Sequence, residues 1–199
     1  MSISLVAGLG NPGREYENTR HNLGWVVIDA FVHQLGLVWK KQAQFEAQVA
    51  RWDRPGLASC HFVKPLTFMN DSGRAVSALA RYYKLGPAAV AAVYDDANID
   101  LGLVKVTTTG SAGGHNGVAS LLEHLGTGFA RYRLGIGPKL PPQMDLKDFV
   151  LAKFAPDQLS LIQQTLPHYL QGLSLLLTDG PDPAMNLLNR RAKNEPEQT

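Results

Sequence analysis

The chain has 199 residues, of which 45% are apolar and 18% charged, a composition that is ordinary for a globular protein able to bury a sizeable core. Its 19 Lys and Arg residues against 17 Asp and Glu residues leave a net charge of +2, which permits an anionic partner without requiring one. The single cysteine, Cys60, excludes an internal disulfide and a zinc site built from several cysteines. Because the sequence shows no signal-peptide pattern and no apolar run of about 18 residues, we expect a cytoplasmic protein with no membrane partner.

The first third of the chain predicts a strand, a helix and a hairpin. The stretch "ISLVAGLG" is apolar and ends in glycines, which is typical of a buried strand. From Leu23, apolar residues recur at positions 23, 26, 27, 30, 31 and 35, the spacing of an amphipathic helix, and Asn22 is suited to be its N-cap. "FEAQVARW" and "LASCHFVK" then predict the two strands of a hairpin, joined by the turn "DRPG".

The rest of the chain alternates predicted helices and strands. A helix over 71–84 is followed by the strands "VAAVYDD", "LVKVTTT" and "RYRLGIG", with another helix before the last of them. An apolar-periodic stretch over 157–178 contains Pro167, which should bend or break it. A short helix and a flexible polar tail at 192–199 follow. We therefore predict one α/β domain over residues 1–191, a three-layer sandwich in which helices flank a twisted mixed, mostly parallel sheet.

The loop after the first strand, "GLGNPG", contains a literal G-x-G-x-x-G motif. A dinucleotide site would need the helix to begin inside this motif and an acid at the end of the next strand. Here the helical pattern begins only after Asn22, and Asp29 falls within it. We therefore expect no nicotinamide, flavin or other cofactor. The alternatives are a tight turn without a ligand and a loop whose backbone and Asn11 amide approach one.

Polar residues also follow other predicted strands. Asn70 ends "KPLTFMN" just before a helix, where it is either a ligand group or an N-cap. Asp95 and Asp96 end a buried strand and should face opposite ways, so at most one enters a shared pocket. This disfavours a pair of glycosidase carboxylates and favours one acid that orients a histidine. "GSAGGHNG" offers backbone N–H groups and Asn116 at a helix start, with His115 as a second base, a structural residue or an RNA-facing residue.

His21 lies between the Gly-rich loop and the first helix, in "TRHN". Histidine has an unperturbed pKa near neutrality, which suits a general base, although the residue is also compatible with the polar first turn of a helix. The sequence holds no P-loop, G-x-S-x-G or H-E-x-x-H motif, and its other histidines lack metal-ligand spacing. We therefore expect no metal site.

Five blocks together carry a resemblance: "GLGNPGREYENTRHNLG", "KPLTFMNDSG", "YDDANIDLG", "GSAGGHNG" and "RYRLGIG". Their order and spacing resemble the bacterial-type peptidyl-tRNA hydrolases over nearly the whole chain. The resemblance implies a monomeric esterase that frees tRNA for reuse in translation by hydrolysing the ester between a peptide and the 3′-terminal ribose. It implies His21 as the catalytic base, Asp95 as its partner, no metal and no DNA partner. The implied substrate-binding residues are Asn11, Tyr16, Met69, Asn70, His115 and Asn116.

The resemblance also implies tRNA-binding residues and shows two departures. Arg133 matches a phosphate-binding position of the family, but Thr107 stands where many members carry a lysine. Lys105 shares the strand face of Thr107, so we expect it to substitute in part. Asn98 replaces an acid common in the family. Residues 138–148, "PKLPPQMDLKD", form either a lid or rim of the crevice or an ordinary surface loop.

Two rival functions remain to be separated. A non-catalytic RNA-binding protein of the same fold would not need the histidine, the acid and the three asparagines together. A metal-dependent hydrolase would lose turnover after exhaustive chelation.

Overall fold

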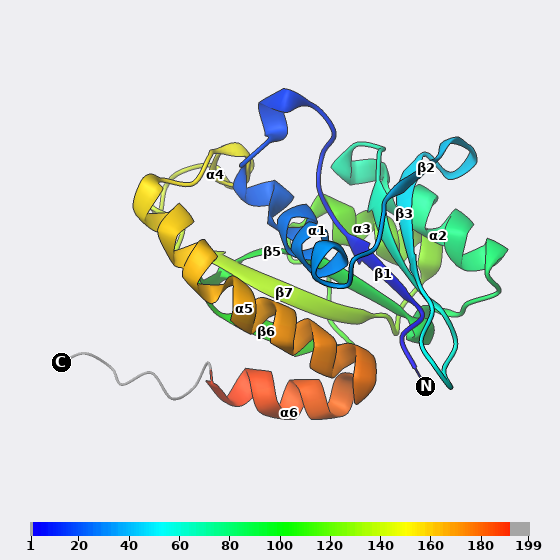
Figure 1. Cartoon of the computed structure of the whole chain (residues 1–199). Coiled ribbons are helices and arrows are strands. Elements are labelled where there is room, and N and C mark those ends of the chain that lie inside the picture. Colours follow the sequence, from blue (N-terminus) through cyan, green and yellow to red (C-terminus); the bar gives the residue numbers. More distant parts are fainter. Residues whose placement is uncertain (1, 192–199) are drawn as a thin grey trace.

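A seven-stranded sheet forms the centre of the molecule (Figure 1). This computed structural model describes residues 2–191, and the predicted tail at 192–199 lies outside the described residues. The strands are β1 (Leu5–Gly8), β2 (Lys40–Gln42), β3 (Ala47–Trp52), β4 (Cys60–Pro65), β5 (Val90–Asp100), β6 (Val104–Thr107) and β7 (Ala130–Gly137). They lie in the order β2-β3-β4-β1-β5-β7-β6. The neighbours β4, β1, β5 and β7 run parallel, whereas β2, β3 and β6 join through antiparallel pairs.

Helices and short turns connect these strands. The α-helices are α1 (Leu23–Gln34), α2 (Ser72–Tyr82), α3 (Asn116–Leu125), α4 (Leu146–Leu151), α5 (Pro156–Thr178) and α6 (Pro181–Arg191). The 3-10 turns are η1 (Arg14–Tyr16), η2 (Arg20–Asn22), η3 (Ala43–Phe45), η4 (Met69–Asp71) and η5 (Pro87–Ala89). No helix within the described range is long and apolar enough to cross a membrane.

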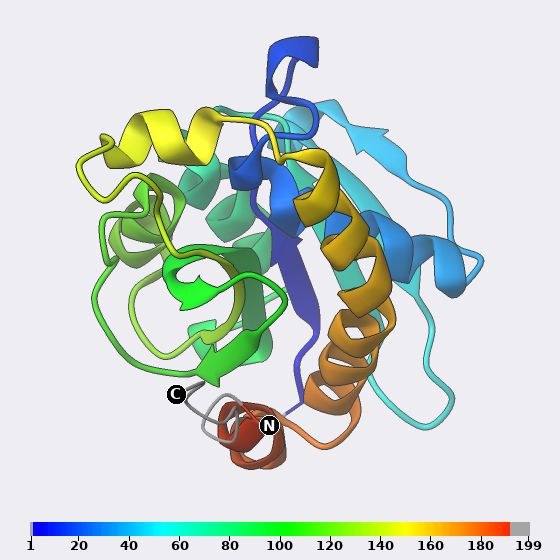
Figure 2. The same cartoon turned by 90° about the vertical axis from the view of Figure 1, so that its left-hand side faces the viewer.

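Helices cover both faces of the sheet (Figures 1 and 2). Successive side chains of a strand point to opposite faces, so each buried strand contributes to two cores. In β1, Val6 packs in the core beneath α1, α5 and α6, while Leu5 and Ala7 pack in the core beneath α2 and α3. The predicted three-layer sandwich with a mixed sheet is therefore confirmed.

The predicted break at Pro167 does not occur, because α5 runs through it as one helix of 23 residues. A proline inside a helix removes one backbone donor and costs about 3 kcal/mol. Burial of Ile162 before the proline, and of Tyr169 and Leu173 after it, anchors both halves of the helix to the sheet. We attribute the continuity of α5 to this packing.

The start of α1 lies unusually close to the ends of β1 and β5. A Cβ on Gly24 would lie 2.4 Å from the Val93 carbonyl oxygen and 2.7 Å from that of Leu9, so only glycine permits this approach. The helix begins at Leu23 and not inside the glycine motif, as expected. The residues just before α1 are thereby held at the carboxyl edge of the parallel strands, where ligands bind in open α/β sheets.

Candidate active site

A crevice of about 670 Å³ opens at this edge of the sheet. Its walls come from the loop after β1, η2, η4, the end of β5, residues 112–116 and α4. The structure brings together in it most of the residues that the sequence analysis singled out: Asn11, His21, Met69, Asn70, Asp95, His115 and Asn116.

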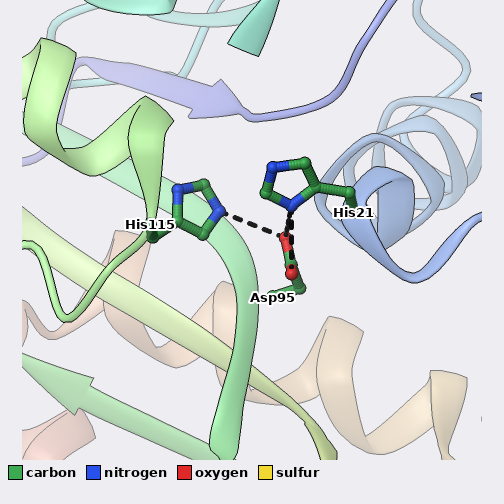
Figure 3. Close-up of side chains that lie close together, drawn as sticks. All are labelled: His21, Asp95 and His115. Carbon is green, nitrogen blue, oxygen red and sulfur yellow. Dashed lines mark hydrogen bonds and ion pairs between the residues drawn. The ribbon is translucent and has the colours of Figure 1, made fainter. Parts of the chain in front are cut away.

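His21 and Asp95 both line the crevice and form a hydrogen-bonded pair (Figure 3). The Nδ1 atom of His21 lies 2.9 Å from Oδ1 and 3.1 Å from Oδ2 of Asp95. Both residues are buried, with 6% of His21 and 2% of Asp95 exposed. When Nδ1–H donates to the carboxylate, Nε2 on the opposite edge of the ring carries a lone pair. The pair therefore has the arrangement of a general base and the acid that orients it.

Asp95 is charged in this setting. Burial alone raises the pKa of its carboxyl group. The His21 and His115 rings, and the hydrogen bonds that both donate, lower it by more than burial raises it, so the pKa lies well below the usual range. The third hydrogen bond joins His115 Nε2 to Asp95 Oδ1 at 3.1 Å. A carboxylate that accepts from two imidazoles is fixed in place.

Asp96 behaves differently from its neighbour. Its Oδ2 atom lies 2.9 Å from Nε of Arg133, on the other face of the sheet from His21. The expectation that at most one of the two acids enters the pocket is wrong, because Asp96 also lines the crevice. The pairing of β5 with β7 is irregular between Asp96 and Asp100.

The Asn11 amide is oriented by its neighbours. Its Oδ1 atom accepts the backbone N–H of Met69 at 2.7 Å, which leaves the NH₂ group for a ligand. The side chain of Asn22 accepts from the Asn11 backbone N–H at 2.9 Å and donates to its carbonyl at 3.0 Å. Asn22 therefore braces the loop. Asn22 is the N-cap residue of α1, as predicted, but its side chain makes no capping hydrogen bond, because both ends of its amide are used for Asn11.

Asn70 and Asn116 are exposed at the crevice. Asn70 lies in η4, and α2 begins after it with no side-chain cap, so the N-cap alternative for Asn70 is wrong. Asn116 is the first residue of α3, as expected. Both amides are thus available to a ligand.

The rim of the crevice carries one residue that sequence reasoning missed. Phe68 is 58% exposed and lines the crevice, and its ring lies edge-on to Tyr16 with centroids 6.3 Å apart. Tyr16 lies beside the rim and does not line the crevice itself. Lys139, Leu146 and Lys147 form the opposite side, so residues 138–148 are a rim and not an ordinary surface loop.

Comparison with known proteins identifies the family. A family model described as peptidyl-tRNA hydrolase matches residues 5–197. The chain belongs to the peptidyl-tRNA hydrolase family. It is 39% identical to a peptidyl-tRNA hydrolase of Gloeobacter violaceus over 197 residues, covering 98% of each chain. It is 41% identical to one of Synechocystis sp. over 192 residues, covering 96% of this chain and 98% of the relative. A crystal structure of peptidyl-tRNA hydrolase from Acinetobacter baumannii matches with a TM-score of 0.85 and 33% identity, covering 94% of each chain.

In this member of the peptidyl-tRNA hydrolase family, Lys105 and Arg133 lie outside the crevice. They stand opposite each other on β6 and β7, so their side chains leave the same face of the sheet. Thr107 stands opposite Arg131. The buried Arg131 guanidinium donates to the carbonyls of Gly110 and Ser111 and so holds the 108–114 loop.

The cluster of His21, Asp95 and His115 has the atom spacing of a metal site, yet its hydrogen bonds do not suit a metal ion. Nδ1 of His115 accepts two backbone N–H groups, so its proton lies on Nε2. A protonated Nε2 has no lone pair for a metal ion. The cluster is arranged for handling protons.

Proposed function

We propose that this chain hydrolyses the ester between a peptide and the 3′-terminal ribose of peptidyl-tRNA, with His21 as the general base. Membership of the family supports the reaction. The observation that carries the mechanism is the contact of 2.9 Å between His21 Nδ1 and Asp95 inside the asparagine-lined crevice.

In the proposed reaction, water attacks the ester carbonyl carbon and gives its proton to Nε2 of His21. A positioned base of this kind accelerates a reaction by roughly 10² to 10⁴-fold. Asp95 holds the proton on Nδ1 and stabilises the imidazolium as it forms. The imidazolium then returns the proton to the departing ribose oxygen. Because water is the nucleophile, no residue becomes acylated.

The three asparagines provide the polar contacts for substrate. With Oδ1 occupied by the Met69 N–H, Asn11 offers only N–H donors, which suit a carbonyl oxygen or the oxyanion that develops from it. Asn70 and Asn116 reach the crevice from two further elements. Amide groups pair with peptide backbone whatever the side chains are, as an enzyme acting on any nascent peptide requires. We place Met69 and Tyr16 around the same substrate. His115 also lines the crevice, but both of its ring nitrogens make their hydrogen bonds inside the protein.

The proposal also covers the contacts with tRNA, the oligomeric state and the cellular location. Lys105 and Arg133 are proposed to contact tRNA phosphate, because they put two positive groups on one face of the sheet and Arg133 contacts Asp96 of the crevice. We propose a monomer that acts in the cytoplasm, where translation produces the substrate, with no DNA or membrane partner and no cofactor. Independence from metal would show as turnover that survives exhaustive chelation.

The test measures release of tRNA from N-acetyl-aminoacyl-tRNA. We expect His21→Ala to lower kcat by at least about 100-fold, since it removes the base. The matched control is His33→Ala, because His33 is an exposed histidine near the end of α1. This variant should keep the rate of the protein without substitutions. If His21→Ala kept that rate, the mechanism would be wrong. A protein that binds tRNA without releasing it would instead favour the non-catalytic RNA-binding alternative.

A further inference from the structure

His115 uses both of its ring nitrogens inside the protein. Nδ1 accepts the backbone N–H groups of Gly117 at 3.1 Å and Val118 at 3.2 Å, and so caps the start of α3. A nitrogen that accepts two N–H groups cannot carry a proton of its own, so the ring proton lies on Nε2. That atom lies 3.1 Å from Asp95 Oδ1, the oxygen that also lies 2.9 Å from Nδ1 of His21 (Figure 3).

A second proton on this ring would have to go to Nδ1. It would then face two N–H donors at a helix start, where the helix dipole is also positive. The titratable side chains packed against the ring are Asp95 and Tyr94 on β5 and His21 on η2. Asp95 faces the ring on the Nε2 side, where the Nε2–H group already donates to it. These contacts favour the Nε2–H tautomer of His115, in which the ring is a donor to Asp95.

From this geometry we propose that His115 is a positioning residue for the hydrolysis, a neutral donor that fixes Asp95 toward His21. This inference rests on the proposed function. A neutral donor holds Oδ1 without cancelling the carboxylate charge, so that charge stays available to the imidazolium that forms on His21. Two histidines share one carboxylate, and their surroundings give one the role of base and the other that of support. His115 then has no polar ring atom left for substrate.

Two substitutions separate the bonds that His115 makes. In His115→Asn, the amide oxygen occupies nearly the place of Nδ1 and keeps the helix cap, but the side chain is too short to reach Asp95. In His115→Gln, the amide reaches the place of Nε2 and can donate to Asp95, but the cap is lost. His124→Asn is the control, since His124 is an exposed histidine of the same helix whose Nδ1 contacts only the Ser120 carbonyl.

We expect His115→Asn to lower kcat by about tenfold or more, with KM changed by less than about twofold, because a hydrogen bond to a charged group is lost. Its thermal midpoint should stay near that of the unchanged protein. His115→Gln should lower the thermal midpoint yet lose less of kcat than His115→Asn. His124→Asn should match the unchanged protein. If His115→Asn raised KM and kept kcat, His115 would contact substrate and the inference would be overturned.

A spectroscopic readout tests the tautomer apart from turnover. Side-chain ¹⁵N spectra at neutral pH, with the His115 signals assigned from His115→Asn, should show a protonated Nε2 and a bare Nδ1. An Nδ1–H tautomer, or an imidazolium, would overturn the inference and leave the proposed function standing. If the protein without substitutions released no tRNA, the proposed function would be wrong, and the positioning role would fall with it.

Discussion

Arg133 forms an ion pair that orients its guanidinium. Its guanidinium is 2.9 Å from Asp96, which lines the crevice, and it stands opposite Lys105 on the adjoining strand. The ion pair holds the guanidinium in one direction and leaves further N–H donors free to bind phosphate. A phosphate near this pair would therefore meet an arginine that is already oriented.

Replacing Arg133 should separate tRNA binding from ester chemistry. We expect Arg133→Ala to lower kcat/KM by about tenfold on N-acetyl-aminoacyl-tRNA, since one phosphate contact is lost, and to change it by less than about twofold on short N-blocked aminoacyl esters. The comparison of the two substrate classes is the measurement. Arg81→Ala, an exposed arginine of α2, controls for loss of positive charge. Equal losses on both substrates would refute the phosphate role.

The resemblance to the family marked His21, Asp95 and the three asparagines, and the structure gathers them in one crevice. It did not mark the brace that Asn22 provides or the cap that His115 provides. These roles depend on which atoms meet when segments distant in sequence fold together, such as Asn22 and the backbone of Asn11. Residue type alone favoured a local helix cap for Asn22, and a longer-range bond displaced it.

At the scale of elements, Arg20 joins the segment that carries the base to the rim of the crevice. Its guanidinium donates to the Phe149 and Lys153 carbonyls and to the Gln158 side chain. It also lies over the rings of Phe149, at 4.7 Å, and Phe154, at 5.3 Å. Burial lowers the pKa of Arg20. The Arg20 side chain thus links η2 to the end of α4 and the beginning of α5 through hydrogen bonds.

Removing the hydrogen bonds of Arg20 should destabilise the protein. Arg20→Met keeps an apolar stem but leaves buried carbonyls without donors, which should cost about 2 to 4 kcal/mol in free energy of unfolding. Urea unfolding of the variant beside Arg14→Met, an exposed arginine of η1, measures the loss. Arg20→Lys should fall between the two, because an ammonium cannot serve the same forked set of acceptors. A free energy within about 0.5 kcal/mol of the unchanged protein would contradict this view of Arg20.

Across the whole molecule, the sandwich could be predicted because predicted strands alternate with predicted helices along the chain. The continuity of α5 could not, because it depends on the packing of that helix against the sheet. Tyr132 of β7 lies at this contact, with its hydroxyl 2.7 Å from the Tyr169 carbonyl of α5. Burial raises the pKa of both phenols, that of Tyr132 far above its usual range, and raises that of the Cys60 thiol to about 12.

These buried acids predict that stability falls in alkali. The unfolded chain releases phenol protons near pH 10, whereas the native protein retains them, so the unfolded state binds fewer protons and the free energy of unfolding decreases as pH rises. This contribution is fully present below about pH 9. Tyr132→Phe should start about 1 kcal/mol less stable, since a hydrogen bond is lost, but its slope between about pH 10 and 11 should be shallower by up to about 1.4 kcal/mol per pH unit. Urea unfolding at several pH values gives both slopes, and identical slopes would mean that Tyr132 ionises in the native protein as easily as in the unfolded chain.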